Sequence, residues 1–233
     1  VDLGVDYDGF YAASLLSASG LLEADEKLLI ATADHIFDES IVSDICRSEL
    51  SAGVTDVCVL VDFANRPLTG LPATTVGVRC SGDARRVSEL SRELGRPMVN
   101  GQTCPDGVGI EAGLFACIGG TIFDRLATLA ESKDYHTITD AIQELADSGC
   151  VASMSTGGRK WVAVETTEEL EESRSSQMIQ RSRSNSDVSP TALTDLSASP
   201  PAFLHEPVPV FFIAGGTAPN SRASSKTSLH QQK

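Results

Sequence analysis

Short apolar runs alternate along this chain with segments in which apolar residues recur every three or four positions. Continuous short apolar runs predict buried strands, and the longer spacing predicts amphipathic helices. The predicted strands cover residues 27–33, 55–63, 75–80, 108–117, 151–154 and 160–165, with 85–89 as a further candidate. The predicted helices cover 10–22, 39–50, 122–129 and 138–145. This alternation predicts an α/β layered fold with a mostly parallel sheet.

The strand predicted at 27–33 is followed by two acidic residues, Asp34 and Asp38. Ligands of open α/β sheets bind beyond the carboxyl ends of strands, where an Asp can hold a divalent cation that bridges phosphate oxygens. The alternative for each Asp is to cap the next helix, and Asp38 fits that role better because Asp38-Glu39-Ser40 opens the helix at 39–50. Asp34 is therefore a candidate metal ligand, with capping as its alternative.

Two local signals predict how the backbone turns later in the chain. Gly113 lies inside the strand predicted at 108–117, where a glycine marks either a bulge or the close approach of a ligand. Thr166-Thr167-Glu168-Glu169 has the spacing of a capping box and predicts the start of a last helix.

The periodic pattern stops near Ser173. The Ser/Arg/Pro-rich sequence that follows has too little apolar surface to order itself. We therefore predict a body over residues 1–172 and a disordered linker or tail over 173–233. Serines beside arginines suggest phosphorylation, and a tail with no regulatory role is the alternative. Residues 203–216 either begin a second module or dock back onto the body as a strand.

The chain carries a formal charge of −14. Residues from Ser173 onward contain six Lys/Arg and three Asp/Glu, a surplus of +3, so residues 1–172 carry −17. Nucleic-acid binding needs a basic surface. Because residues 1–172 are strongly acidic, we expect no binding to nucleic acid. A phosphate ligand would need a metal or a local basic patch.

The six cysteines form no C-x-x-C pair and no Cys/His cluster with zinc spacing. We expect reduced core thiols and hence a cytoplasmic protein. No apolar run approaches the roughly 18–20 residues of a membrane span. The opening VDLGVDYDG has neither a Met nor the basic region of a signal peptide, and we expect a fragment of a longer product.

A set of stretches occurs along residues 9–172 in a characteristic order: GFYAASLLSA, IATADHIFDESIV, VCVLVDF followed by ATTVGV, VGIEAGLFAC, HTITDAIQELADSG and KWVAVETTEELEES. The set resembles the C-terminal two-thirds of sugar-phosphate nucleotidyltransferases, and the inositol-phosphate cytidylyltransferases in particular. These enzymes join an NTP to a phosphorylated sugar or alcohol and release pyrophosphate. The resemblance implies a three-layer Rossmann-like fold with a mixed sheet, Mg2+ as cofactor and CTP as the favoured nucleotide.

The resemblance also implies roles for single residues. Asp34 would be the magnesium ligand near the α-phosphate, and Gly9 would lie against the nucleobase. The sugar or alcohol pocket would be lined by Glu111 and Gly113, and the acceptor side by Thr139 and Asp140.

Structural alternatives exist for several of these residues. Gly9 is otherwise a turn, Glu111 a solvated strand acid and Thr139 a helix cap. We interpret His35 as a hydrogen-bonding residue beside the site rather than a ligand, and Trp161 as a core residue.

Two departures from the family pattern suggest impaired activity. The family begins with a glycine-rich loop containing Arg and Lys that cradles the triphosphate, and we find no counterpart in this chain. Its closing strand reads W-x-D-x-D, whereas Ala163 stands here where the second metal ligand is expected. Glu165 falls on the same face of that strand, about 6–7 Å further along, and would have to bind through a water.

Arginines concentrate between positions 79 and 96, at Arg79, Arg85, Arg86, Arg92 and Arg96. Because Arg can hold phosphate through two hydrogen bonds, this group is a candidate phosphate patch. The resemblance implies Arg96 as the first choice for the acceptor phosphate, because the family often has a Lys near this position. The alternative is a solvated helix over 87–94 with salt bridges.

The first hypothesis is a nucleotidyltransferase domain that transfers CMP to a sugar or alcohol phosphate, impaired in this chain. No general base is required, since a phosphate dianion is already nucleophilic at neutral pH. The second hypothesis is a non-catalytic nucleotide- or partner-binding module with a regulated tail. A glycosyltransferase fits less well, because no D-x-D follows the strand at 27–33. The oligomeric state stays open.

Overall fold

The computed structural model describes residues 12–63, 75–81, 85–99, 106–132, 137–164, 166–168, 170–171 and 210–213. Within these residues, no helix is both long enough and apolar enough to cross a membrane.

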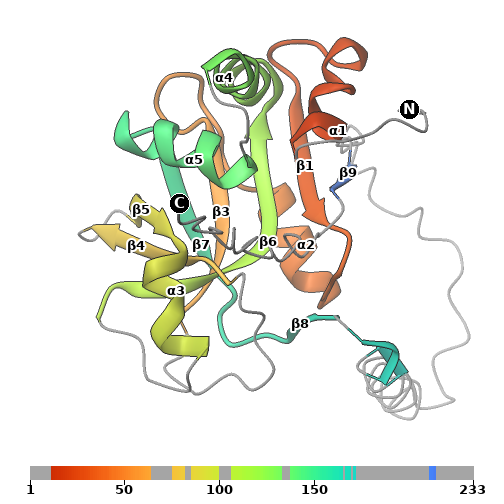
Figure 1. Cartoon of the computed structure of the whole chain (residues 1–233), viewed down its shortest axis with the longest axis vertical. Helices are drawn as coiled ribbons and strands as arrows, with labels where there is room; N and C mark the ends of the chain where they lie inside the picture. Colours follow the sequence, from red (N-terminus) through yellow and green to blue (C-terminus); the bar gives the residue numbers. More distant parts are fainter. Residues whose placement is uncertain are drawn as a thin grey trace, which may run out of the picture.

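Helices lie between groups of strands along the described chain (Figure 1). The strands are β1 (Lys27–Thr32), β2 (His35–Phe37), β3 (Val57–Asp62), β4 (Gly77–Ser81), β5 (Arg86–Ser91), β6 (Val108–Ile118), β7 (Val151–Ser155), β8 (Trp161–Ala163) and β9 (Val210–Ile213). The helices are α1 (Ala13–Leu16), the 3-10 turn η1 (Ser19–Leu21), α2 (Glu39–Cys46), α3 (Arg92–Val99), α4 (Gly119–Ser132) and α5 (Ile138–Asp147). The predicted strands all have counterparts, and the mixed α/β class is confirmed.

The main sheet has seven strands in the order β3-β7-β5-β4-β6-β1-β9, and β3 also pairs with β6. That extra pairing closes β3, β7, β5, β4 and β6 into a ring. β1–β9 and β3–β7 are parallel, whereas the remaining pairings among the described strands are antiparallel. The prediction of a mostly parallel sheet is therefore wrong. Apolar runs report burial rather than direction, and β6 runs antiparallel to β1, β3 and β4.

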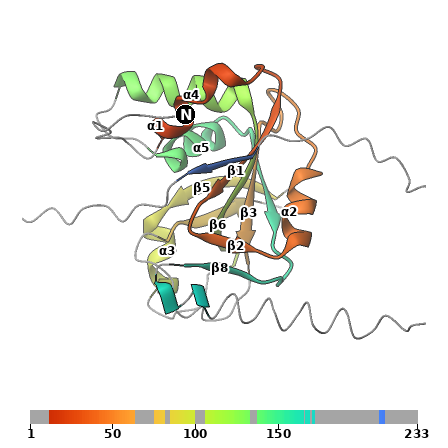
Figure 2. The same ribbon diagram turned by 90° about the vertical axis from the view of Figure 1, so that its right-hand side faces the viewer.

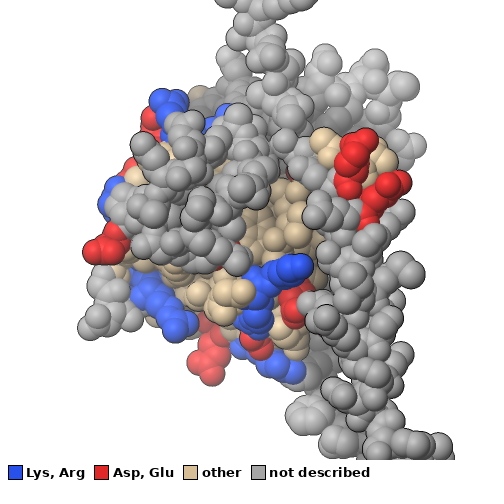
Figure 3. Space-filling model, turned by 90° about the horizontal axis from the view of Figure 1, so that it is seen from below, with Lys and Arg blue, Asp and Glu red and all other residues tan. Residues whose placement is uncertain are grey.

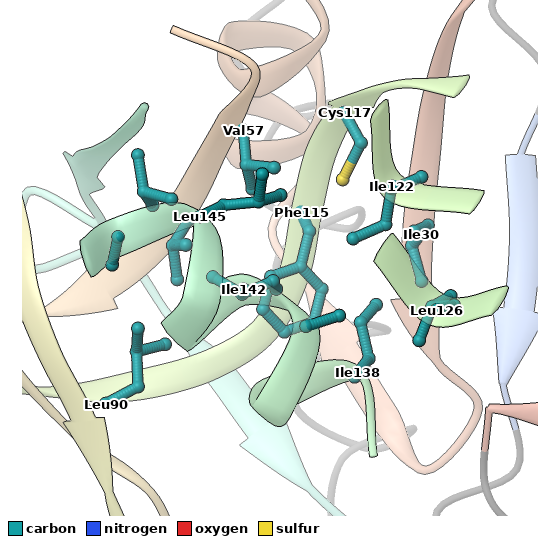
Figure 4. Close-up of a cluster of buried hydrophobic side chains, with 14 of the residues drawn as sticks. Ile30, Val57, Leu90, Phe115, Cys117, Ile122, Leu126, Ile138, Ile142 and Leu145 are labelled. Atoms are coloured by element: carbon teal, nitrogen blue, oxygen red, sulfur yellow. The ribbon is translucent and has the colours of Figure 1, made fainter. Parts of the chain in front are cut away.

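Helices cover both faces of this sheet (Figure 2): α1, α4 and α5 lie on one side and α2 on the other. Alternate residues of a strand point to opposite faces. Accordingly Phe115 of β6 packs with α4 and α5 (Figure 4), while its neighbour Leu114 packs against Ile41 and Ile45 of α2. The sheet thus carries a separate apolar core on each face, and the three-layer nucleotidyltransferase arrangement remains a prediction.

Local signals explain where the helices near the site begin. Asp38 caps α2, because its side chain accepts a hydrogen bond from the Ser40 backbone N–H, as predicted. A capping box formed by Thr137 and Asp140 opens α5. The cap of α5 is therefore Thr137, two residues before the Thr139 proposed from sequence.

Three segments differ from the sequence-based prediction. The single helix expected over 10–22 is, where described, the short α1 followed by η1. The alternative prediction of a solvated helix over 87–94 is wrong, because residues up to Ser91 belong to strand β5 and helix α3 begins only at Arg92. For residues 203–216 we predicted either a second module or a strand that docks onto the body. The described part, β9, is a strand that pairs with β1, which agrees with the second alternative.

Candidate functional site

Asp34 and His35 lie where β1 ends and turns into β2. Asp34 Oδ1 is 2.6 Å from His35 Nδ1, and Thr32 Oγ1 is 2.7 Å from the same nitrogen. A carboxylate can only accept a hydrogen bond, so we infer that Nδ1 carries the proton. The Thr32 hydroxyl donates to the Gly113 carbonyl oxygen at 3.2 Å. These contacts fix the Asp34 carboxylate through Oδ1, while its side chain stays 36% exposed.

The imidazole ring of His35 is held by aromatic neighbours on the β2–β8 ribbon. Its centroid lies 5.6 Å from that of Trp161 with an interplanar angle of 4°, and 6.1 Å from that of Phe37. In the register of the ribbon, His35 stands opposite Ala163, and Phe37 opposite Trp161. The stack explains why the His35 side chain is only 14% exposed. Trp161 therefore supports the site as well as the core predicted for it.

Asp62 extends this support into the protein interior. Trp161 Nε1 donates to Asp62 Oδ2 at 2.8 Å, and Thr156 Oγ1 donates to Asp62 Oδ1 at 3.3 Å. Asp62 is 1% exposed. Sequence reasoning missed this residue, although the signal was the same as for Asp34: an acid at the end of an apolar strand.

A bulge in β6 brings this strand against Thr32 and His35. The register of β3 against β6 shifts between Val59 and Val61, and Gly113 in the bulge has φ +74°. A Cβ at position 113 would overlap Thr32 Oγ1 and lie 3.0 Å from His35 Cγ. Of the two interpretations of this glycine, the bulge is confirmed. The atoms that lie close to the Gly113 backbone are side-chain atoms of Thr32 and His35.

Glu111 lies beside the bulge and is partly buried, so the alternative of a solvated strand acid is wrong. Its Oε1 accepts a hydrogen bond from the Gly113 N–H. Burial raises the pKa of the Glu111 carboxyl to about 7, the nearby Asp34 charge raises it further, and the Gly113 hydrogen bond opposes the shift. Two carboxyl groups with different environments thus meet at this end of β1, and Glu111 can hold a proton near neutral pH.

The structure does not bring all the predicted residues to this place. Gly9 and Glu165 lie outside the described residues, so their nucleobase and metal roles stay predictions. Thr139 and Asp140 lie in the first turn of α5, where the Asp140 carboxylate accepts from the Thr137 N–H and hydroxyl. Among the residues that the structure describes, no group of three or more His, Cys, Asp or Glu could hold a metal ion.

Three of the five arginines between positions 79 and 96 have side-chain hydrogen-bond or ion-pair partners in the structure. Arg96 pairs with Glu93 at 2.7 Å on an exposed part of α3, Arg79 pairs with Glu89 at 3.2 Å, and the Arg86 guanidinium donates to the Gly149 carbonyl oxygen. In the view from below the molecule (Figure 3), basic and acidic side chains lie next to one another on the described surface. The geometry favours salt-bridged surface arginines, and a phosphate role for Arg96 stays a prediction.

Comparison with known proteins gives two structural similarities. No protein-family model matches the chain, and no curated protein sequence matches it. The inositol-1-phosphate CTP transferase from T. maritima superposes with a TM-score of 0.47 and 16% identity over 68% of this chain and 56% of that one. A protein described as a glucose-1-phosphate thymidylyltransferase from Bacillus anthracis gives 0.45 and 14% over 69% of this chain and 58% of that one. The chain therefore spans less than two thirds of either protein, and we build the proposal below on its own residues.

Proposed function

We propose that this chain is a nucleotidyltransferase domain that binds an NTP, with CTP favoured, at the carboxyl end of β1. The observation that carries this proposal is the Asp34 carboxylate, oriented by His35 and still open to solvent. The hydrogen bond from His35 uses Oδ1, and the cation would bind Oδ2. Mg2+ is usually bound through one or two carboxylates together with phosphate oxygens and waters, and Asp34 fits that requirement.

The reaction would be an in-line transfer of CMP to a phosphorylated sugar or alcohol. An oxygen of the acceptor phosphate forms a bond to the α-phosphorus of CTP, the bond from that phosphorus to the β-bridging oxygen breaks, and pyrophosphate leaves with the electron pair. When bound, Mg2+ would offset the charge on the phosphates. Asp34 would hold the cation, and the His35–Trp161–Asp62 contacts would keep Asp34 in place.

A second candidate is a non-catalytic nucleotide-binding module. Ala163 lies directly opposite His35 in the β2–β8 register, at the position where the family resemblance implies an acid. With one carboxylate instead of two, the site would hold a metal-bound nucleotide but turn it over slowly. We therefore expect weak activity, and binding without turnover would favour the module.

The test is calorimetric titration of the full chain with CTP, UTP and GTP, with and without Mg2+. Asp34→Asn should abolish the Mg2+-dependent binding. Asp25→Asn is the matched control, because Asp25 is an exposed acid just before the other end of β1 and lines a hollow beside α4. Trp161 provides a second readout, since it is the single tryptophan of the chain and stacks on His35.

Each result separates the possibilities. Binding that needs Mg2+ and Asp34, followed by pyrophosphate release with sugar or inositol phosphates, supports the enzyme. Binding without release supports the non-catalytic module. Absent binding, or binding that Asp25→Asn removes and Asp34→Asn leaves intact, contradicts a nucleotide site at this end of β1.

A further inference from the structure

A hollow of 530 Å³ lies at the end of the sheet opposite the candidate site, beside α4, which is at the top of Figure 1. Residues of the loop before β1, of the turn after α2 and of α4 line it. Its walls include Ala24, Asp25, Ala52, Thr121, Asp124 and Arg125. β1 runs away from the hollow, from Lys27 to Thr32, so that the whole strand separates it from Asp34. The hollow is therefore separate from the candidate nucleotide site.

Hydrogen bonds between these segments fix the walls of the hollow. The buried Asp56 carboxylate accepts from the Gly53 N–H at 2.8 Å and from the Thr121 hydroxyl at 3.4 Å, which ties the turn after α2 to the start of α4. The Gly120 N–H donates to the Ala24 carbonyl oxygen at 2.7 Å and ties the loop before β1 to the same helix. A surface held in this way is ordered before a partner arrives, which lowers the entropic cost of binding.

Two exposed apolar side chains flank the hollow. Leu21 is 67% exposed and Val54 is 56% exposed, and they are the large apolar residues that the described part of the chain leaves exposed. Leu21 precedes Ala24 by three residues, and Val54 follows Ala52 by two residues. Three residues span at most about 11 Å, so both side chains lie near the rim. Apolar groups beside a concave, partly polar surface are typical of a binding site for another protein.

The charge in the hollow favours a cationic group. Asp124 and Asp25 both contribute carboxylates, while the charge of Arg125 is offset by its ion pair with Glu144 at 3.3 Å. A metal ion does not fit, because the described residues contain no group of three or more His, Cys, Asp or Glu that could hold one. A guanidinium group does fit, because it pairs with a carboxylate through two hydrogen bonds.

We propose that this end of the molecule is a docking surface for a partner protein that presents an arginine flanked by apolar residues. The guanidinium enters the hollow and pairs with Asp124, and the flanking apolar side chains cover Leu21 and Val54. Arginine suits this place because its planar, weakly hydrated cation is among the commonest anchors of protein interfaces. The surface lies away from Asp34, so the inference goes beyond the proposed function.

The experiment measures, by fluorescence anisotropy at about 0.15 M salt, the binding of a labelled peptide of alternating arginine and leucine to the full chain. The test variant is Asp124→Lys. The matched control is Glu131→Lys, which makes the same charge change at an exposed position further along α4. We expect the Kd to rise about tenfold or more in the test variant and to stay within about twofold in the control. A peptide with citrulline in place of arginine should not bind.

A second variant, Leu21→Ser/Val54→Ser, keeps the charge and removes the apolar contacts. It should raise the Kd about threefold or more, and the unfolding midpoint should stay unchanged because both side chains are exposed. Equal effects of Asp124→Lys and Glu131→Lys would show attraction by net charge alone and overturn the inference. Binding of the citrulline peptide, or no binding of the arginine peptide, overturns it as well.

A third variant separates a partner protein from the Ser/Arg-rich sequence of this chain. Arg174→Ala/Arg181→Ala/Arg183→Ala removes three basic charges from that sequence. Tighter binding of the arginine peptide to this variant would show that the chain's own arginines compete for the surface, and it would overturn a separate partner. An affinity within about twofold of the unaltered chain supports the partner.

Discussion

The geometry of the candidate site depends on a few side chains around His35. The imidazole proton faces Asp34 and Thr32, and the ring face contacts Trp161. Gly113 closes this group from β6 because its missing Cβ leaves room for Thr32 and His35. Each of these residues limits the positions that Asp34 can adopt. Substitutions here should therefore show which residues contribute to the stability of the fold and which contribute to ligand binding.

Gly113→Ala should lower the free energy of unfolding more than Gly53→Ala. Both glycines have φ +74°, so a left-handed Ala costs roughly 1–2 kcal/mol at either position. Only at Gly113 would the new methyl group also overlap Thr32, which adds roughly 1–3 kcal/mol. Nothing lies within 4 Å of a Cβ at Gly53, which makes it the matched control. Equal losses in urea denaturation would contradict the tight packing at Gly113.

Glu111→Gln should flatten the pH dependence of stability between about pH 4.5 and 7. The folded state raises the pKa of Glu111 from 4.5 to about 7 and so binds more protons than the unfolded chain in this range. The stabilising contribution is therefore full below the unfolded pKa and is lost as the pH rises through 7, with a slope of at most about 1.4 kcal/mol per unit. Gln keeps the acceptor for the Gly113 N–H but does not ionise. Identical slopes in urea unfolding of the two proteins would contradict the assignment.

At the scale of secondary-structure elements, the helix caps show which residues near the start of α2 and α5 have a structural role. α2 begins at the Asp38 cap and α5 at the Thr137–Asp140 box. The box engages Asp140, which the resemblance places on the acceptor side. Thr139, in the same turn, lies outside the box. The neighbouring threonines 137 and 139 therefore allow a direct comparison.

Thr137→Ala should destabilise the protein by about 1 kcal/mol, because α5 loses the side-chain acceptor of its cap. Thr139→Ala should change stability by less than about 0.5 kcal/mol. If Thr139 contacts the acceptor substrate, its replacement raises the KM for the sugar or alcohol phosphate instead. Thermal unfolding and steady-state kinetics of both variants check this division. A stability loss confined to Thr139→Ala would contradict the observed cap.

At the scale of the whole molecule, charge and strand order determine what the protein can bind. The formal charge of −14 opposes polyanions over most of the surface, while the last 27 residues, 207–233, carry only basic charges. The closed ring of strands leaves β1 and β9 outside it, and the candidate site lies where these two strands end. Phosphate binding should therefore be local and depend on Mg2+.

The same charge predicts no measurable binding to duplex DNA. Non-specific binding draws its free energy from counterions released by basic side chains, and the described arginines of residues 79–96 include several that are paired with Glu or a carbonyl. Fluorescence anisotropy of a labelled duplex should stay constant up to roughly 50 μM protein at low salt. A salt-sensitive rise in anisotropy would show that the tail or these arginines form a basic surface after all.

The sequence by itself determined the features that depend on neighbouring residues. Apolar runs predicted the buried strands because a buried strand consists of consecutive apolar side chains. Asp38-Glu39-Ser40 predicted the cap of α2 because a cap forms hydrogen bonds only with the next few residues. The position of Asp34 after β1 followed from the end of its run. Tertiary structure decided strand direction, the β6 bulge against Thr32, the Trp161–Asp62 hydrogen bond and the pairing of β9 with β1. These features join residues that are far apart in the chain. The pattern of apolar residues within a segment does not specify which distant segment it pairs with.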